Sequence, residues 1–349
     1  MDNRLHDEEL IEKIRVKKRE LGSQLLILTH HYQKKEIVSL GDFAGDSFEL
    51  SRKAAADREC RYIVFCGVHF MAESAAILAK PHQVVQIPDE LAGCWMAEMA
   101  DTQTVKSAFE QLESIAGKGS ATPLVYMNSD AELKSFCGDR GGVVCTSSNA
   151  AKAVEWAFAQ REKVLFFPDR HLGHNTGYDL GLKDDEMVVW AADKPLGGND
   201  PEALRRARLV LWDGYCLVHT RFTRDHIEKR RAEFPEAKII VHPECPREVV
   251  ALADACGSTS RIEKYVREAP AGSTIVIGTE INMIERLASQ YPDKKIIELH
   301  RSLCPNMAKI SLEKLLQTVE NVGEMNVVRV DEEIKAGARV ALDRMLALG

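Results

Sequence analysis

Three of the nine cysteines lie in sequence contexts that suit a metal ligand. Cys94, Cys216 and Cys304 each stand in a loop-like stretch beside glycine or proline. Thiolates bind zinc and iron–sulfur clusters, so these residues predict a metal site if the fold brings them together. Zinc would take His219 or His242 as a fourth ligand, whereas a [4Fe–4S] cluster held by three thiolates keeps one iron open as a Lewis acid. The residues alone also leave open that no metal binds.

Acid–base chemistry is suggested by the segment His242-Pro243-Glu244, which follows an apolar run. Glu244 is the candidate general base, with a pKa that burial would bring near the working pH. Tyr32, Tyr126 and His219 are weaker candidates, because a single such side chain at a strand end is often only a structural hydrogen-bonding group.

Three short hydroxyl-rich turns each precede a helical pattern, and they could bind an anion. These turns are Gly45-Asp46-Ser47, Thr146-Ser147-Ser148-Asn149 and Gly257-Ser258-Thr259-Ser260. A helix N-terminus offers unpaired N–H groups and partial positive charge, although serine and threonine there also serve as plain N-caps. Three such turns aimed at one centre favour a small substrate with several negative charges.

The elements that would position these residues form an internal repeat. Each of three units has an apolar run ending in a polar cluster, then a hydroxyl-rich turn, a second apolar run and one loop cysteine. The spacing from His30 to Ser47 is nearly matched from Asn128 to Ser147 and from His242 to Ser258. The middle unit is longer, with an extra segment around residues 180–199.

Strands alternating with helices predict parallel sheets, whose ligands bind beyond the carboxyl ends of the strands. We therefore expect an α/β protein of three pseudo-symmetric three-layer α/β/α domains around a central active site. The first domain comprises residues 1–95 with a returning tail, 305–349, the second 96–215 and the third 216–304. An N-terminal helix and two helices in the tail complete the prediction.

Composition excludes several classes of protein. The chain has 349 residues, 45 % of them hydrophobic and 28 % charged, which is typical of a globular protein of two to three domains. A net charge of −7 argues against a nucleic-acid partner, and no apolar stretch is long enough to span a membrane. The first 21 residues lack the apolar core of a signal peptide, and cysteine is sparse, so we expect a cytoplasmic protein.

From residue 30 to about 316 the chain resembles the quinolinate synthase family, the A protein of de novo NAD biosynthesis. The resemblance rests on specific motifs, among them His30-His-Tyr32-Gln, Tyr126-Met-Asn128-Ser, Cys145-Thr-Ser147-Ser-Asn149, Pro168-Asp169-Arg-His-Leu-Gly173, Gly214-Tyr-Cys216-Leu-Val-His219, His242-Pro-Glu244-Cys245-Pro, Gly278-Thr-Glu280 and Cys304-Pro-Asn-Met307. It implies three pseudo-symmetric α/β domains, in agreement with the repeat.

The resemblance also implies a reaction. Iminoaspartate (iminosuccinate) condenses with dihydroxyacetone phosphate to give quinolinate, phosphate and water, and L-aspartate oxidase supplies the imine. By resemblance, a [4Fe–4S] cluster is held by Cys94, Cys216 and Cys304, and Glu244, Tyr32 and His219 are catalytic. The implied substrate-binding residues are His30, Ser47, Tyr126, Met127, Asn128, Ser147, His242, Pro243, Glu244, Ser258 and Thr259.

Two rival functions use the same residues differently. One is a zinc-dependent lyase or aldolase that acts on a sugar phosphate. The other is a non-enzymatic iron–sulfur redox sensor, in which the hydroxyl-rich turns would be helix caps alone. Metal content and a turnover assay for quinolinate separate the three possibilities.

Overall fold

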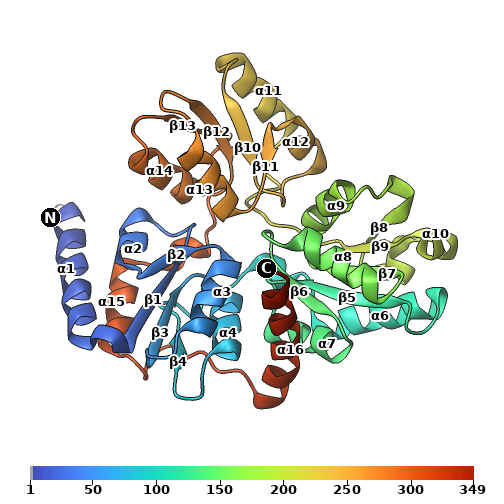
Figure 1. Cartoon of the computed structure of the whole chain (residues 1–349), viewed down its shortest axis with the longest axis horizontal. Coiled ribbons are helices and arrows are strands. Elements are labelled where there is room, and N and C mark those ends of the chain that lie inside the picture. The colour runs from blue at the N-terminus through green and yellow to red at the C-terminus, as the bar shows by residue number, and fades with distance from the viewer. Residues whose placement is uncertain (1–2) are drawn as a thin grey trace.

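The structure, a computed structural model, describes residues 3–349 and contains three parallel sheets, each flanked by helices (Figure 1). The first sheet has the order β2-β1-β3-β4, and the third has the equivalent order β11-β10-β12-β13. The second sheet, β6-β5-β7-β9-β8, repeats that order with one strand added. Every strand pairing within the sheets is parallel, so the predicted α/β fold of three related units is confirmed.

The first unit follows the expected order of elements. Its strands are β1 (Leu25–His30), β2 (Phe43–Gly45), β3 (Tyr62–Cys66) and β4 (Val84–Gln86), and its helices are α1 (Asn3–Leu21), α2 (Lys35–Leu40), α3 (Ser47–Ala56), α4 (His69–Leu78) and the short α5 (Trp95–Glu98). All six residues of β1 are buried, as an apolar strand in the middle of a parallel sheet should be.

The second unit carries the extra length. Its strands are β5 (Ala121–Tyr126), β6 (Val143–Cys145), β7 (Lys163–Phe167), β8 (Met187–Trp190) and β9 (Leu209–Trp212), and its helices are α6 (Thr102–Ala116), α7 (Ala131–Asp139), α8 (Ala150–Gln160), α9 (Arg170–Asp179) and α10 (Pro201–Arg206). The added edge strand β8 lies within the segment that the sequence marks as extra.

The third unit has strands β10 (Lys238–Val241), β11 (Ala255–Cys256), β12 (Thr274–Gly278) and β13 (Lys295–Glu298), and helices α11 (Arg224–Glu233), α12 (Arg247–Leu252), α13 (Thr259–Glu268) and α14 (Ile281–Gln290). Part of its interior is a separate apolar cluster that includes Phe222, Val241 and Val276. The third unit is therefore partly independent of the core that the other two units share.

The tail has two helices that pack against different units. Helix α15 (Leu312–Glu320) lies on α1 and β3 of the first unit, as the sequence predicts. Helix α16 (Glu332–Leu348) differs from that expectation, because it packs mainly against α7 of the second unit. The reason is close backbone contact: a Cβ on Gly138 would lie 2.0 Å from the carbonyl oxygen of Gly337. The predicted domain boundaries remain a prediction.

Within residues 3–349 we find no helix that combines the length and the apolar character needed to cross a membrane.

Candidate active site

The carboxyl ends of the central strands in all three sheets converge on one cavity of about 820 Å³, counting its opening to solvent. In Figure 1 this is the centre on which the three lobes meet. Polar side chains from every unit line it: His30, Tyr32, Asp46, Ser47, Cys94, Tyr126, Asn128, Thr146, Ser147, Cys216, His242, Glu244, Thr259, Cys304 and Asn306. A cavity between three units allows each to contribute one strand-end cluster.

The three predicted metal-binding cysteines meet at this cavity. Cys94 directly precedes α5, Cys216 lies in the loop after β9, and Cys304 lies in the loop after β13. Burial raises the pKa of the Cys94 thiol to about 12, and burial with the charges of Glu244 and the other two cysteines raises the pKa of Cys216 well above its usual value of 9. Such thiols are neutral unless a metal replaces the proton, so the donor set suits a metal that binds thiolates.

The remaining six cysteines do not line the cavity. Cys60, Cys66, Cys137, Cys145 and Cys245 are buried, and Cys256 is half-buried. The Cys137 thiol, for example, donates to the carbonyl oxygen of Pro123 at 2.9 Å and packs in the core of the second unit. These contacts agree with the interpretation of such residues as small apolar side chains.

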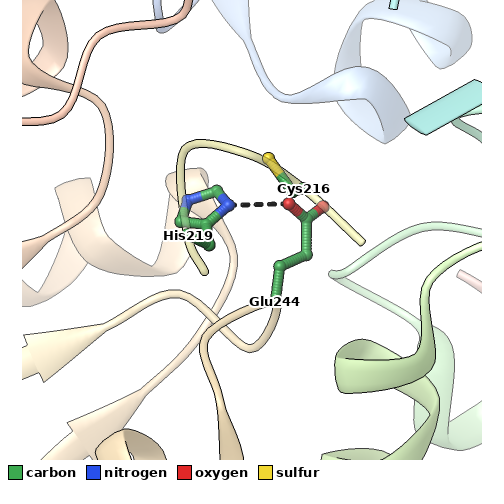
Figure 2. Close-up of side chains that lie close together, drawn as sticks. All are labelled: Cys216, His219 and Glu244. Atoms are coloured by element: carbon green, nitrogen blue, oxygen red, sulfur yellow. Dashed lines mark hydrogen bonds and ion pairs between the residues drawn. The ribbon is translucent and has the colours of Figure 1, made fainter. Parts of the chain in front are cut away.

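Glu244 accepts two hydrogen bonds that hold its carboxylate. The Tyr126 hydroxyl donates to Oε1, and His219 Nδ1–H donates to Oε2 at 2.7 Å (Figure 2). Ligand atoms of Cys216, His219 and Glu244 all lie within 4.8 Å of one another. Glu244 and Tyr126 line the cavity, whereas His219 lies behind Glu244 and is buried.

The pKa of Glu244 moves opposite to the sequence-based expectation. Burial would raise it, but the neighbouring imidazoles of His242 and His219, with hydrogen bonds from His219 and Tyr126, outweigh burial and lower the pKa below its usual value of 4.5. Glu244 is therefore a carboxylate at neutral pH. A carboxylate in this position can orient the His219 ring and stabilise it when it carries a second proton, as in other carboxylate–imidazole pairs.

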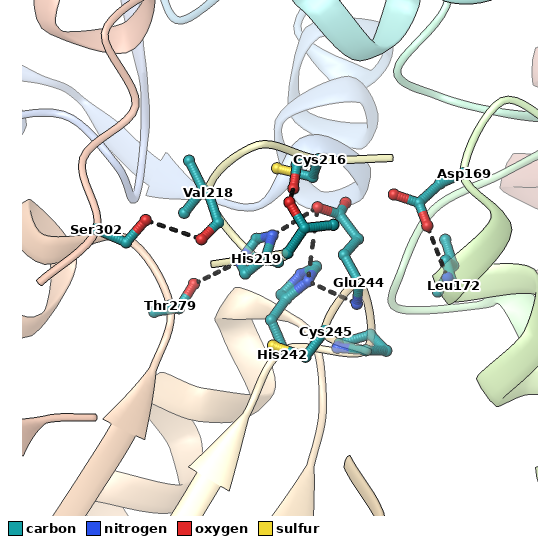
Figure 3. Close-up of polar contacts among 12 residues, drawn as sticks. Asp169, Leu172, Cys216, Val218, His219, His242, Glu244, Cys245, Thr279 and Ser302 are labelled. Atoms are coloured by element: carbon teal, nitrogen blue, oxygen red, sulfur yellow. Dashed lines mark hydrogen bonds and ion pairs between the residues drawn. The ribbon is translucent and has the colours of Figure 1, made fainter. Parts of the chain in front are cut away.

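The loop that carries Cys216 and His219 is fixed by its own backbone and by the third unit. The backbone N–H of His219 donates to the carbonyl oxygen of Cys216 at 3.2 Å, forming a tight turn. The Ser302 hydroxyl donates to the carbonyl oxygen of Val218 at 2.8 Å (Figure 3). Cys216 and His219 are thus held in one tight turn.

His30 and His242 occupy equivalent places in the first and third units. In each, Nδ1 accepts a hydrogen bond from the backbone N–H two residues later, that of Tyr32 at 3.2 Å and of Glu244 at 3.3 Å. Burial lowers the pKa of both imidazoles to about 3, so both rings are neutral. Because Nδ1 accepts, the proton is on Nε2, which makes each ring a donor suited to a substrate carboxylate or phosphate.

Some residues of the hydroxyl-rich turns cap helices, and others line the cavity. Asp46 caps α3 through the N–H groups of Phe48 and Glu49, and Ser258 caps α13 at Arg261. Ser47, Ser147 and Thr259 line the cavity, and across residues 3–349 their hydroxyls donate to no protein acceptor. A neighbour does the capping at α3 and α13, so these hydroxyls are free to bind an anion.

Four predicted site residues do not line the cavity. Met127 is fully buried and its sulfur faces the Ser74 hydroxyl, Ser258 is a cap, and Pro243 lies in a groove outside the cavity. His219 lies behind Glu244. The sequence analysis missed an apolar wall made by Val68, Phe70, Met71, Trp95, Met96, Leu217, Val218, Pro305 and Met307. The sequence does indicate most of these apolar residues, since most stand within two residues of a predicted strand end or loop cysteine.

The neutral buried histidines predict acid sensitivity. Between pH 6.5 and about 3 the unfolded chain binds protons that folded His30 and His242 do not, so stability falls as the pH drops through this window. One pH unit below 6.5, each of these two histidines lowers the free energy of unfolding by about 1.4 kcal/mol. Between about pH 7.5 and about pH 5.5 the free energy of unfolding should fall by about 1.4 kcal/mol more in wild type than in His242→Gln, because the variant lacks this histidine. Anaerobic urea unfolding measures this.

The exposed loop residue His82 is the matched control, and His82→Gln should keep the wild-type dependence on pH. Equal losses for wild type and His242→Gln would show that His242 is protonated in the folded protein.

Comparisons with known proteins bear on this site. A family model described as "Quinolinate synthetase A protein" matches residues 12–347. The chain is 49 % identical to a protein of Corynebacterium glutamicum named "Quinolinate synthase", over 99 % of this chain and 89 % of that protein. Proteins with the same name from Acidobacterium capsulatum (49 % identical, 99 % of this chain, 94 % of that one) and Bacillus anthracis (46 %, 97 % and 93 %) are similar over most of their length.

Proposed function

The chain belongs to the quinolinate synthase family, and on that premise we propose that it condenses iminoaspartate with dihydroxyacetone phosphate to give quinolinate, phosphate and water. The observation that carries the proposal is a single cavity bearing three thiols, two neutral histidine donors and three free hydroxyls. A dicarboxylate and a phosphate ester present several anionic groups, and these donors come from all three units to receive them.

The cofactor that we propose is a [4Fe–4S] cluster. Cys94, Cys216 and Cys304 would hold it, one ligand from each loop that faces the cavity. When bound, its open iron supplies a Lewis acid that assists loss of hydroxyl groups. The residues fit this group because thiols with raised pKa values need a cation to become thiolates.

Zinc is the rival cofactor, and Cys216, His219 and Glu244 form a possible ligand set. In the structure, however, both ring nitrogens of His219 are already hydrogen-bonded, Nδ1 to Glu244 and Nε2 to Tyr32 and Thr279. A zinc site there would also leave Cys94 and Cys304 at the cavity without a role. Zinc on the three cavity cysteines with His242 would use all three thiols, and metal analysis separates it from the cluster. We favour the cluster because the family resemblance implies it.

The protein groups divide into binding and proton transfer. We assign substrate carboxylates and phosphate to His30, His242, Asn128 and the hydroxyls of Ser47, Ser147 and Thr259, all at the cavity wall. Ring formation removes protons from carbons next to C=O or C=N groups. We assign these transfers to Glu244 and Tyr32, which reach the cavity, with His219 linking them from behind.

The same proposal includes a supplier and a compartment. Iminoaspartate hydrolyses readily in water, so an oxidase acting on L-aspartate is the proposed source of this substrate. All nine cysteines are free thiols, and three would carry an oxygen-sensitive cluster, which suits the reducing cytosol. The reaction transfers the three-carbon group of dihydroxyacetone phosphate to iminoaspartate with phosphate as a leaving group, so we class the enzyme as a transferase.

Anaerobic purification followed by metal analysis and a product assay tests the proposal. We expect brown protein with about four irons and four sulfides per chain. Quinolinate, identified by mass spectrometry, should form only when both substrates are present. Stoichiometric zinc without iron, or cleavage of a sugar phosphate as the only reaction, would contradict it. Iron-loaded protein without any turnover would favour the redox sensor.

The free hydroxyls allow a prediction about binding. Loss of one hydrogen bond to a charged group costs about 1.5–3 kcal/mol. We therefore expect Ser147→Ala and Thr259→Ala each to raise the KM for one substrate about tenfold or more, with iron content unchanged. Ser114→Ala, on an exposed face of α6, is the control. Unchanged kinetics in both variants would make these residues structural.

A further inference from the structure

A buried amide on α9 of the second unit has no part in the function described above. Asn175 is 2 % exposed and does not line the cavity. Helix α9 packs against α12 of the third unit, so Asn175 lies where these two units meet. Its Nδ2 donates to the carbonyl oxygen of Pro243 at 2.8 Å and to that of Cys245 at 2.9 Å. These two residues stand directly before and after Glu244.

The turn that carries Glu244 is closed from within by His242. The backbone N–H of Glu244 donates to His242 Nδ1 at 3.3 Å (Figure 3), and the backbone N–H of Cys245 donates to the carbonyl oxygen of His242 at 3.0 Å. Across residues 3–349 the carbonyl oxygens of Pro243 and Cys245 accept no other hydrogen bond. The Asn175 amide therefore anchors the backbone of this turn to the second unit.

Helix α9 is a firm support for this contact. Its first turn is capped by Asp169, whose side chain accepts a backbone N–H of the helix at 2.7 Å. A Cβ on Gly173 would lie 2.5 Å from the Leu211 side chain, so the helix lies directly on the sheet of the second unit. Tyr126, from the same sheet, donates to Glu244 Oε1. The second unit thus holds both the side chain of Glu244 and the backbone around it.

The amide can face the turn in one orientation only. The two atoms that it meets are carbonyl oxygens, which accept and never donate, so the NH₂ group must point toward them. Asn175 Oδ1 is then buried without a hydrogen-bond partner in the described part of the chain. A buried acceptor without a partner costs free energy, so the contribution of this side chain lies in its two donated hydrogen bonds.

We propose that Asn175 is a positioning residue for Glu244. It fixes the backbone on both sides of Glu244, and the carboxylate then reaches its two hydrogen-bond donors, Tyr126 and His219. Because Asn175 does not line the cavity, it acts through Glu244 and not on the substrate. A displacement of about 1 Å in a reacting group can lower a rate ~100-fold. This inference deepens the proposed function and rests on it.

Substrate binding should depend on Asn175 less than turnover does. His242, which we assign to substrate binding, is held by the sheet of the third unit, because its backbone N–H donates to the carbonyl oxygen of Gly278 at 3.1 Å. The other groups that we assign to binding lie on other segments of the chain. Loss of the Asn175 contact should therefore displace Glu244 and leave the binding groups in place.

The test compares Asn175→Leu with Asn199→Leu in the iron-loaded enzyme. Leucine has nearly the shape of asparagine but donates no hydrogen bond. Asn199 is the matched control, because its Nδ2 also donates to backbone carbonyl oxygens, that of Val189 at 2.8 Å and that of Gly197 at 3.2 Å, away from the cavity. We expect Asn175→Leu to lower kcat about tenfold or more, with KM for both substrates and iron content within about twofold of wild type. Asn199→Leu should keep the wild-type kcat.

A double-mutant cycle with Glu244→Gln shows through which residue Asn175 acts. If Asn175 positions the Glu244 carboxylate, its loss has no further effect once that carboxylate is gone. We therefore expect the kcat of the double variant Asn175→Leu/Glu244→Gln to lie within about twofold of that of Glu244→Gln alone. A residue with only a structural role would lower kcat by the same factor in both backgrounds.

The inference would be overturned by a kcat for Asn175→Leu equal to that of Asn199→Leu, by a defect confined to KM, or by equal losses of kcat in the two backgrounds. Should Asn175→Leu not fold, Asn175→Ala replaces it in both comparisons, because the space beside the smaller side chain admits water that can satisfy the two carbonyl oxygens. Failure of both variants to fold would assign Asn175 to stability alone and would also overturn the inference. If the wild type makes no quinolinate, the proposed function itself fails, which is a separate result.

Discussion

Cys216→Ala is expected to abolish both the iron–sulfur absorbance and quinolinate formation. Of the three cavity cysteines, Cys216 is the one whose thiol lies beside Glu244 and His219, within 4.8 Å (Figure 2). A site with three protein thiolates has no spare ligand, because the other six cysteines are packed away from the cavity. Loss of one thiolate should therefore release the whole cluster.

Cys137→Ala is the matched control, since Cys137 is a free thiol that is buried in the core of the second unit and does not line the cavity. It should keep full absorbance and activity, although a small cavity will lower its stability. Cys94→Ala and Cys304→Ala should behave as Cys216→Ala does. A Cys216→Ala protein with full iron content and turnover would show that the ligands are assigned wrongly.

Glu244→Gln is expected to lower kcat by ~10²–10⁴-fold, the usual contribution of a positioned acid–base group, while iron content stays unchanged. The carboxylate accepts from Tyr126 at Oε1 and from His219 at Oε2. An amide has only one oxygen, so its NH₂ group must face one of these two donors. Glutamine thus loses the proton-accepting charge and one of the two hydrogen bonds that hold this side chain, either that from Tyr126 or that from His219.

Stopped-flow or steady-state assays with both substrates measure this loss, and binding of dihydroxyacetone phosphate should be retained. Glu73→Gln is the control, a half-buried glutamate on α4 that does not line the cavity. Because the pKa of Glu244 is lowered, its protonation should not shape the rate profile near neutral pH. Turnover by Glu244→Gln within a few-fold of wild type would show that Glu244 is not the base, which would then be Tyr32 or His219.

The fold was largely predictable because each unit repeats the same local pattern. A buried parallel strand such as β1 is continuously apolar and ends in a polar cluster, and both signals are local in sequence. The packing partner of α16 was not predictable in this way. An amphipathic pattern shows that a helix is half-buried, but it does not show which helix covers it. The close contact between Gly337 and Gly138 exists only in the folded chain.

For the site, residue type and position could be predicted, but not electrostatics. The strand-end positions of His30, Glu244 and the three loop cysteines placed them correctly at the cavity. The direction of the Glu244 pKa shift depends on His242, two residues away, and also on His219 and Tyr126, which are distant in sequence and meet Glu244 only after folding.

The proposed condensation is tested most directly by measuring quinolinate and phosphate in one sealed anaerobic assay. The assay contains iron-loaded wild-type protein, iminoaspartate and dihydroxyacetone phosphate. We expect both products to accumulate together, one phosphate for each quinolinate, and neither to form with Cys216→Ala. Phosphate release without quinolinate, or no product from protein with a complete cluster, would contradict it.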